Sequence, residues 1–447
     1  MTHHLILGAG PAGVIAAETI RKHAPHDTIT VVGDEPEPPY SRMAIPYLLM
    51  GNIGEGGTHL RKSPTHFADL KIKLIHARAQ QVNAAAKTVV LDNGQTLSFD
   101  RLLIATGSTP VNPPIPGMDS AGVHHCWTLD DARQIMKRAV KGARVLQLGA
   151  GFIGCIIMES LAARGVQLSV VEMGDRMVPR MMGPTAGGMI KDWCEAKGVK
   201  VYTGARVESI TPAGAGGGLI SQIVSALGVG DDSPTGALLV RLSTGQVIEA
   251  DLVISAAGVK PLIGFLENSG ITCLQGVLTD EHLQTNVPGI YAAGDCAEAF
   301  DKVSGKTIVS AIQPNAAEQA RVAALNMVGQ KSELKGVTQI NVLDTLGLIS
   351  TSFGNWEGVA GGEHVELTDK AAERHLSLQF KGDVMVGCNS VGWTEHVGVM
   401  RGLVEGAVPL GEWKGRLMRD PTRLMDAYLD CAQGQAHWSG AADERRR

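Results

Sequence analysis

The residue spacing that most directly predicts chemistry in this sequence is that of two glycine-rich motifs, each at the end of an apolar run. The chemistry is the binding of a pyrophosphate. The runs read LILGAGPAG at residues 5–13 and VLQLGAGFIG at residues 145–154. In G-x-G-x-x-G, the first glycine permits a tight strand-to-helix turn, the second lets backbone approach a pyrophosphate, and the third brings helix and strand together. The motif residues are Gly8, Gly10, Pro11, Ala12, Gly13, Gly149, Gly151, Phe152, Ile153 and Gly154. Since each motif precedes a helical stretch and a second strand, the sequence predicts two dinucleotide sites.

Acidic residues follow the second strand of each unit. Asp34 and Glu35 come after the first such strand, where an adenosine ribose would present its hydroxyl groups, and Glu172 ends the second. A carboxylate at this place accepts a hydrogen bond from a ribose 2′-OH and repels a 2′-phosphate, so NADH is favoured over NADPH. Arg176 lies close enough to weaken that preference, and the alternative for Glu172 is an ordinary exposed acid at a strand end.

The composition is that of a multidomain globular enzyme. A chain of 447 residues predicts about three domains, and its 44% hydrophobic and 19% charged content is globular. A net charge of −5 disfavours a nucleic-acid partner. No apolar run approaches the roughly 20 residues of a membrane span, and no signal peptide is expected. The cysteines form no C-x-x-C pair, which indicates a reducing cytoplasm and no metal site. They are Cys126, Cys155, Cys194, Cys273, Cys296, Cys388 and Cys431.

Two further segments complete a resemblance to a known family. LLIATGSTPVNPPIPG contains Ala105, Thr106 and Gly107, and LQTNVPGIYAAGDCAEA contains Asp295. With the two glycine motifs, and in this order, they make the chain similar to the FAD-dependent pyridine nucleotide–disulfide oxidoreductases from residue 1 to about 330. The resemblance implies an α/β fold with two Rossmann-like domains and a C-terminal α+β interface domain. It also implies that Asp295 binds the ribityl chain of FAD, that the ATG segment is the turn out of the FAD domain, and that Ala79 and Gly258 contact cofactor.

The same resemblance predicts the domain boundaries. Residues 1–112 and 255–330 would form the FAD-binding domain, 113–254 the NAD(H)-binding domain, and 331–447 a C-terminal domain that forms a homodimer interface. The glycine-rich segment 212–238 is expected to be a long hairpin loop, with a lid over the nucleotide as the alternative. The polar tail AHWSGAADERRR is expected to fray and lacks the apolar stripe of a membrane anchor.

The segment PPYSRMAIPYLLMGN, residues 38–52, indicates which chemistry is absent. Relatives that reduce disulfides, peroxide or oxygen carry a redox cysteine where this chain has Met43, and a thioether forms neither a thiolate nor a disulfide. Pro11 likewise stands in place of the histidine that assists peroxide chemistry. We expect Met43 to pack against the flavin. The stretch ending at Arg42 is similar to that of ferredoxin and rubredoxin reductases, which implies that Arg42 contacts the FAD phosphates.

The expected function is a thiol-free FAD-dependent NADH:acceptor oxidoreductase. FAD would take a hydride from NADH and pass electrons to a protein or small-molecule acceptor, as in reductases of iron–sulfur proteins or NADH-side subunits such as that of phenylglyoxylate dehydrogenase. Ile156 departs from the family, because a glutamate near the nicotinamide is usual at that place. The alternatives are an NADH oxidase or quinone-type reductase acting directly at the flavin, and a non-catalytic FAD-binding structural or sensor protein. No role is assigned to His59, His66, His124 and His125, which lack metal spacing, and His396 is expected at an interface.

Overall fold

The structure is a computed structural model that describes residues 1–213, 237–301, 303–337 and 339–436. The chain divides into two compact units. Unit 1 comprises Met1–Val111 and Val259–Thr338, and unit 2 comprises Asn112–Gly258 and Gln339–Arg447. The predicted loop or lid at 212–238 and the predicted frayed tail lie almost entirely outside the described residues.

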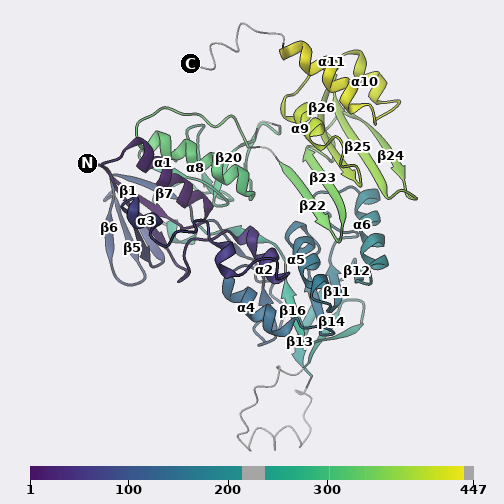
Figure 1. Cartoon of the computed structure of the whole chain (residues 1–447), viewed down its shortest axis with the longest axis horizontal. Helices are drawn as coiled ribbons and strands as arrows, with labels where there is room; N and C mark the ends of the chain where they lie inside the picture. Colours follow the sequence, from purple (N-terminus) through teal and green to yellow (C-terminus); the bar gives the residue numbers. More distant parts are fainter. Residues whose placement is uncertain (214–236, 302, 338, 437–447) are drawn as a thin grey trace, which may run out of the picture. The chain divides into compact units, whose positions relative to one another are not determined.

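Unit 1 is built on a five-stranded parallel sheet of the order β19-β7-β1-β2-β3, of which β1 and β7 are labelled in Figure 1. Its strands are β1 (His3–Leu7), β2 (Thr28–Gly33), β3 (Ile72–His76), β7 (Arg101–Ile104) and β19 (Ile290–Ala292). The central strands are near-continuous runs of buried Leu, Ile and Val, because both faces of a parallel sheet are covered.

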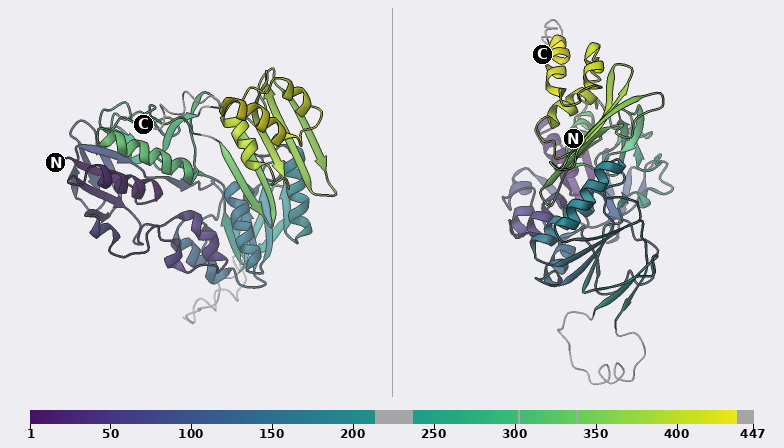
Figure 2. Two further views of the ribbon diagram at one scale, coloured as in Figure 1. Left: turned by 45° about the horizontal axis from the view of Figure 1, so that its top comes forward. Right: turned by 90° about the vertical axis from the view of Figure 1, so that its right-hand side faces the viewer.

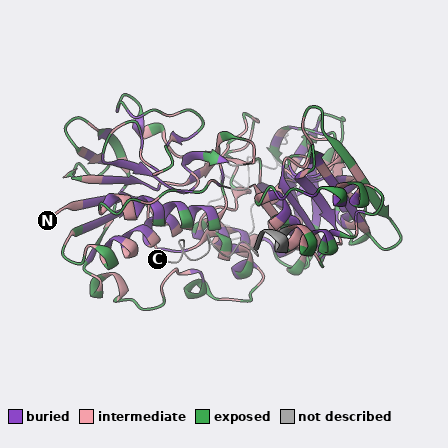
Figure 3. Ribbon diagram, turned by 90° about the horizontal axis from the view of Figure 1, so that it is seen from above, coloured by how far each residue is buried: buried purple, intermediate pink, exposed green. Residues whose placement is uncertain are grey.

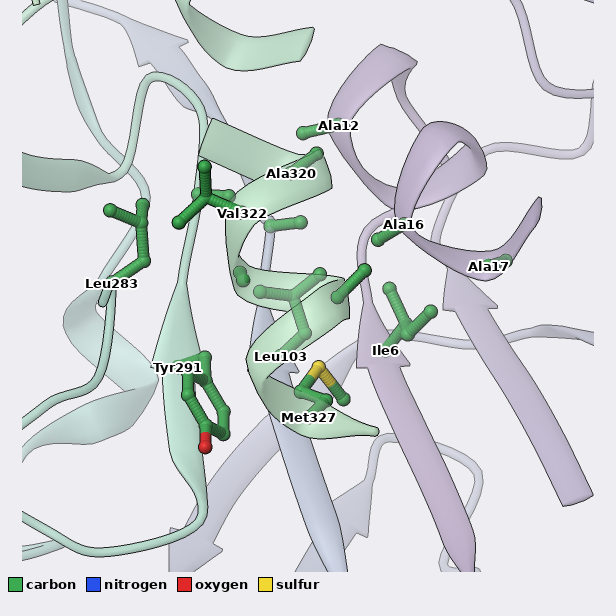
Figure 4. Packing of buried hydrophobic residues seen from close by; sticks show 14 of the residues in the cluster. Ile6, Ala12, Ala16, Ala17, Leu103, Leu283, Tyr291, Ala320, Val322 and Met327 are labelled. Carbon is green, nitrogen blue, oxygen red and sulfur yellow. The ribbon is translucent and has the colours of Figure 1, made fainter. Parts of the chain in front are cut away.

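Two helices lie side by side over one face of this sheet, α1 (Pro11–His23) and α8 (Gln313–Met327), as Figure 4 shows in close-up. Small residues line their contact, and Ala12, Ala16, Ala17 and Ala320 are all buried there with Ile6 of β1. The missing side-chain bulk lets the two helix backbones approach each other closely. This packing fixes both helix N-termini relative to the carboxyl ends of the strands.

The opposite face of the unit 1 sheet is covered by an antiparallel meander, whose Val82, Val89 and Leu91 pack on Leu5 and Leu102 of the sheet. The meander consists of β4 (Ala79–Asn83), β5 (Thr88–Leu91) and β6 (Thr96–Ser98). Two smaller sheets complete the strands of the unit: β8 (Ser108–Pro110) with β17 (Val259–Pro261), and β18 (Val277–Leu278) with β20 (Ala297–Asp301) and β21 (Lys306–Val309). The short helices are η1 (Arg42–Ala44), α2 (Ile45–Leu49), η2 (Glu55–Thr58), α3 (His66–Asp69) and η3 (Gly264–Leu266).

Unit 2 contains a second five-stranded parallel sheet, of the order β12-β11-β10-β16-β9. Its strands are β9 (Val123–His125), β10 (Arg144–Leu148), β11 (Gln167–Glu172), β12 (Lys200–Thr203) and β16 (Leu252–Ser255). The associated helices are α4 (Leu129–Arg138), α5 (Phe152–Ala163) and α6 (Pro184–Ala196). Leu146, Leu148 and Val253 of the sheet pack on Val240 and Leu242 of a meander formed by β13 (Val207–Pro212), β14 (Leu238–Leu242) and β15 (Val247–Ala250).

The C-terminal part of unit 2 is an antiparallel sheet of the order β22-β23-β26-β25-β24 with three helices (Figure 2). The strands are β22 (Ile340–Thr345), β23 (Leu348–Gly354), β24 (Glu363–Asp369), β25 (Arg374–Lys381) and β26 (Val384–Val391), and the helices are α9 (Val397–Glu405), α10 (Glu412–Leu417) and α11 (Leu424–Ala436). Asn389 of β26 bonds to the segment between β11 and α6, because its amide nitrogen donates to the carbonyl of Met181 (2.9 Å) and its oxygen accepts from Gly183 N (3.1 Å).

The predicted fold class is confirmed. Each glycine motif joins a buried parallel strand to a helix, and buried residues concentrate in the strands and on the inner faces of the helices (Figure 3).

Candidate cofactor-binding sites

The glycines of the first motif occupy places that no larger residue fits. Gly8 has φ +115°, and a Cβ there would lie 2.0 Å from the carbonyl oxygen of Ala105, whereas a Cβ on Gly13 would lie 1.9 Å from that of Gly8. Gly10 differs from both, because nothing lies within 4 Å of an added Cβ. The motif therefore combines two tight backbone contacts with one glycine that faces open space, as a pyrophosphate cradle requires. Gly10 also precedes α1, whose N-terminus has no side-chain cap and so keeps N–H groups for an anion.

Each of the two acidic residues after β2 forms an ion pair with an arginine. Asp34 lies 2.9 Å from a guanidinium nitrogen of Arg78, the residue before Ala79 at the start of β4. Glu35 lies 2.6 Å from Arg42 Nη2, and the Tyr40 hydroxyl donates to the same carboxylate. The structure thus brings Glu35 and Arg42 together, as adjoining ribose and phosphate contacts would need. Tyr40 and Arg78 were not predicted from the sequence.

Asp295 lies three residues after the end of β19 and accepts a hydrogen bond from Ser108. The Ser108 hydroxyl donates to Asp295 Oδ2 at 2.9 Å, and Ser108 directly follows the predicted Ala105–Gly107 turn. Burial raises the pKa of the Asp295 carboxyl, while the bond from Ser108 and the charge of Arg42 lower it. A partly buried carboxylate that accepts from Ser108 has acceptor capacity left for a hydroxyl-bearing ligand. The sequence held one hint of this contact, namely that Ser108 directly follows the predicted Ala105–Gly107 turn.

The N-termini of α1 and α8 meet beside Asp295. A Cβ on Gly294 would lie 3.3 Å from Cβ of Ala12 in α1 and 3.6 Å from Cβ of Ala316 in α8. Gly294 N donates to the buried Gln319 side chain of α8 at 2.7 Å. Like α1, α8 lacks a side-chain cap at its N-terminus. Sequence reasoning missed α8, since no glycine motif marks its start.

Met43 lies in the short helix η1 and its side chain is 50% exposed. The preceding Ser41 fixes this segment, because its hydroxyl donates to Gln313 Oε1 at the start of α8, at 2.8 Å. The segment that carries Met43 in place of a cysteine is therefore tied to the N-terminus of α8. Met43 fills no core cavity in unit 1.

The second motif repeats the geometry of the first within unit 2. A Cβ on Gly149 (φ +92°) would lie 2.5 Å from the carbonyl oxygen of Ala256, and one on Gly154 would lie 2.6 Å from that of Gly149. An added Cβ on Gly151 would have nothing within 4 Å. Gly151 precedes α5, whose N-terminus also lacks a side-chain cap. Phe152 and Ile153 form the first turn of α5. The residues present thus fit a second dinucleotide.

Glu172 is fixed by backbone groups at the end of β11. Ala150 N, inside the glycine motif, donates to Glu172 Oε2 at 2.8 Å, and Gly174 N donates to Oε1 at 2.7 Å. Each carboxylate oxygen keeps a second lone pair, so the group can also accept from a ligand hydroxyl. Arg176 is engaged elsewhere: its guanidinium donates to the carbonyl of Met182 (2.9 Å) and to Asp175 (2.7 Å).

The cysteines are all free thiols, and burial raises the pKa of each one. The pKa reaches about 12 for Cys126 and Cys194 and about 11 for Cys296. A thiol with a raised pKa supplies little thiolate near neutral pH and is a poor nucleophile. Among the described residues, no group of three or more His, Cys, Asp or Glu side chains could hold a metal ion, and no helix is long and apolar enough to cross a membrane.

Comparisons with known proteins agree with this geometry. A family model described as pyridine nucleotide-disulphide oxidoreductase matches residues 2–323. The chain is 30% identical over 424 residues to the NADH-dependent phenylglyoxylate dehydrogenase subunit epsilon of Aromatoleum evansii, which covers 94% of this chain and 95% of that protein. It is also 30% identical over 365 residues to the NADH oxidase of Methanocaldococcus jannaschii, covering 78% and 76%. The putidaredoxin reductase–putidaredoxin complex has the same fold, with a TM-score of 0.85 at 22% identity over 96% of this chain and 99% of that chain.

Proposed function

Because the chain belongs to the pyridine nucleotide-disulphide oxidoreductase family and is a FAD-dependent NADH oxidoreductase, we propose that it delivers electrons from NADH to a redox protein or to another subunit of a larger complex, without a redox cysteine. The observation that carries this proposal is the pairing of Met43, at the place of the redox cysteine, with seven thiols whose pKa values are all raised. The phenylglyoxylate dehydrogenase subunit, similar over nearly its whole length, supports the choice of a protein acceptor.

We assign FAD to unit 1. The first motif and the start of α1 would hold the pyrophosphate, assisted by Arg42, and Asp34 and Glu35 would lie at the adenosine ribose. Asp295 would bind the ribityl hydroxyls, with its carboxylate oriented by Ser108. Ala105, Thr106, Gly107 and Ala79 would contribute contacts around them.

We assign NADH to the parallel sheet of unit 2 and propose that NADH is preferred over NADPH. Glu172 supports this preference because a carboxylate held at the strand end would repel a 2′-phosphate. Arg176 supports it too, since its guanidinium is already bound to Met182 and Asp175 and does not offer a free cation. Gly258, with φ +103° and open space at its Cβ, would lie against the nicotinamide half.

The chemistry in this proposal belongs to FAD, which when bound accepts two electrons together and can release them one at a time. The protein residues would bind the two dinucleotides, orient them and exclude water from the reacting groups. No side-chain acid or nucleophile is required, which is consistent with the absence of a thiol at position 43.

Stopped-flow reduction tests the proposal directly. Purified protein with bound FAD should be bleached by NADH within the turnover time of a dye or iron–sulfur protein acceptor, and it should not reduce glutathione disulfide or coenzyme A disulfide. Disulfide reduction that disappears after alkylation would contradict the thiol-free mechanism. Failure of NADH to reduce the FAD would contradict the proposed function as a whole.

The second candidate is direct reduction of oxygen at the flavin, and the 30% identity to an NADH oxidase favours it. Oxygen consumption distinguishes the two. A protein whose acceptor is another protein should oxidise NADH slowly with oxygen alone and much faster when an acceptor protein or dye is added.

We further propose that the protein is a cytoplasmic homodimer whose C-terminal sheet and helices, residues 331–447, form the interface. The free cysteines support a reducing compartment. Light scattering should give twice the 47.0 kDa mass of the chain. Truncation before β22 should produce monomers if the interface is assigned correctly.

A further inference from the structure

A polar cluster stands at the carboxyl edge of the parallel sheet in unit 2, at the ends of β9 and β16. His125 ends β9 and pairs in register with Ser255, which ends β16. Nε2 of His125 lies 2.7 Å from Oδ1 of Asn112, and Nδ1 lies 3.3 Å from the carbonyl oxygen of Ser255. Nδ1–H can donate to the Ser255 carbonyl while Nε2 accepts from Asn112, when the Asn112 amide is turned so that its NH₂ group faces Nε2. His125 thus links the first residue of unit 2 to the end of β16.

The strand order places this cluster on one side of the glycine motif and Glu172 on the other. β10 carries the motif and lies between β11, which ends at Glu172, and β16, which ends at Ser255. In doubly wound sheets a dinucleotide lies across the carboxyl ends of the strands where the strand order reverses. If the adenosine half lies over β11 and the pyrophosphate over the start of α5, the nicotinamide half must lie over the ends of β16 and β9.

The end of β16 also touches the motif itself. Ala256 N donates to the carbonyl of Leu148 at 2.7 Å, and the carbonyl oxygen of Ala256 is the atom that a Cβ on Gly149 would approach to 2.5 Å. Two residues later, Gly258 adopts φ +103°. A displacement of Ser255 would therefore move the backbone of residues 256–258 relative to the phosphate cradle.

We propose that His125 and Asn112 are positioning residues that hold residues 255–258 in place for the nicotinamide half of NADH. This inference rests on the proposed NADH site in unit 2. The apolar Ile156, in the first turns of α5, offers no side-chain hydrogen bond for that task. Contacts that orient the nicotinamide would then come from backbone groups at the end of β16. The hydrogen bonds of the His125 imidazole to Asn112 and Ser255 hold that backbone in position.

The test compares two ligands that share the adenosine half. Binding of NAD⁺ and of ADP-ribose, which lacks nicotinamide, is measured by titration calorimetry on the FAD-containing protein. His125→Leu removes both hydrogen bonds of the bridge, so NAD⁺ must order residues 255–258 as it binds, and its binding should weaken by about five- to tenfold. Binding of ADP-ribose should change by less than about twofold. His125→Gln, which can keep one of the two bonds, should restore part of the NAD⁺ affinity.

His124→Leu is the matched control, because adjacent strand residues point to opposite faces of the sheet, and it should alter neither ligand by more than about twofold. Asn112 is exposed, so Asn112→Ala tests the same bridge even if the His125 variants do not fold. Equal losses for both ligands, or no loss for NAD⁺, would overturn the inference. Wild-type protein that binds neither ligand would instead contradict the proposed NADH site.

Discussion

Glu172 offers a test in which two substitutions at one position should behave differently. Its two oxygens accept backbone hydrogen bonds from Ala150 and Gly174, so the side chain both repels a 2′-phosphate and fixes the glycine motif. Glu172→Ala removes the charge and both acceptors. Glu172→Gln removes the charge but keeps one oxygen, which can still accept one of the two N–H groups.

The magnitude follows from the proposed contact between Glu172 and the ribose 2′-OH of NADH. A hydrogen bond to a charged group contributes about 1.5–3 kcal/mol, and Glu172 is only partly buried, so the lower value applies to this contact. A loss of about 1.4 kcal/mol is a factor of ten. Glu172→Ala should therefore lower kcat/KM for NADH about tenfold or more. In both variants the preference for NADH over NADPH should narrow by about tenfold, because the repulsion of the 2′-phosphate is lost in each.

The assay is steady-state dye reduction with either nucleotide at concentrations well below KM, with FAD content as the check on folding. Glu172→Gln should keep more of the NADH activity than Glu172→Ala while showing the same narrowed preference. Wild-type protein that uses NADPH better than NADH, or an unchanged preference in both variants, would refute the assignment of Glu172.

Three further predictions concern unit 1 and the thiols. Asp295→Asn should lower FAD retention, yet the FAD-free variant should be at least as stable as FAD-free wild type at pH 7 in thermal unfolding. Burial raises the folded pKa of Asp295, so its ionisation destabilises the folded protein at neutral pH. This cost vanishes as the pH falls below the ordinary carboxyl pKa of about 3.9. An Asn variant that is less stable at pH 7 would contradict this. Met43→Ala should leave NADH-dependent dye reduction within about an order of magnitude, because the half-exposed side chain fills no core cavity; complete loss would give Met43 a chemical role. A maleimide reagent at pH 7 should modify only the partly exposed Cys126, Cys273 and Cys431, slowly, as read by mass spectrometry, and activity should persist.

The parts of the site that the sequence predicted are those with local physical requirements. The glycine motifs could be identified because a tight turn needs glycine, and the structure shows a steric reason for Gly8, Gly13, Gly149 and Gly154. The buried strands and the fold class followed from apolar runs in the same way. Each of these requirements acts within a few residues along the chain.

The missed residues depend on contacts between distant parts of the chain. Ser108, which was missed, lies 187 positions before the predicted Asp295, and Gln313 lies 272 positions after Ser41. Neither periodicity nor composition pairs such residues, since the pairing exists only once the strands have their order in the sheet. His125 shows the same limit: lacking metal spacing it received no role, and its partners Asn112 and Ser255 become visible only when β9 lies beside β16.

The convergence of α1 and α8 gives a physical reason why unit 1 suits an anionic dinucleotide cofactor. Both helices begin without a side-chain cap, and their first turns pack on either side of Gly294, next to Asp295. A helix N-terminus carries a partial positive charge of about half a unit, so two of them at one place favour an anion there. The small side chains of Ala12 and Ala316 and the absence of one at Gly294 permit this approach, because larger residues would separate the helix ends. The alanines at this contact therefore serve the electrostatics of the site as well as the packing of the core.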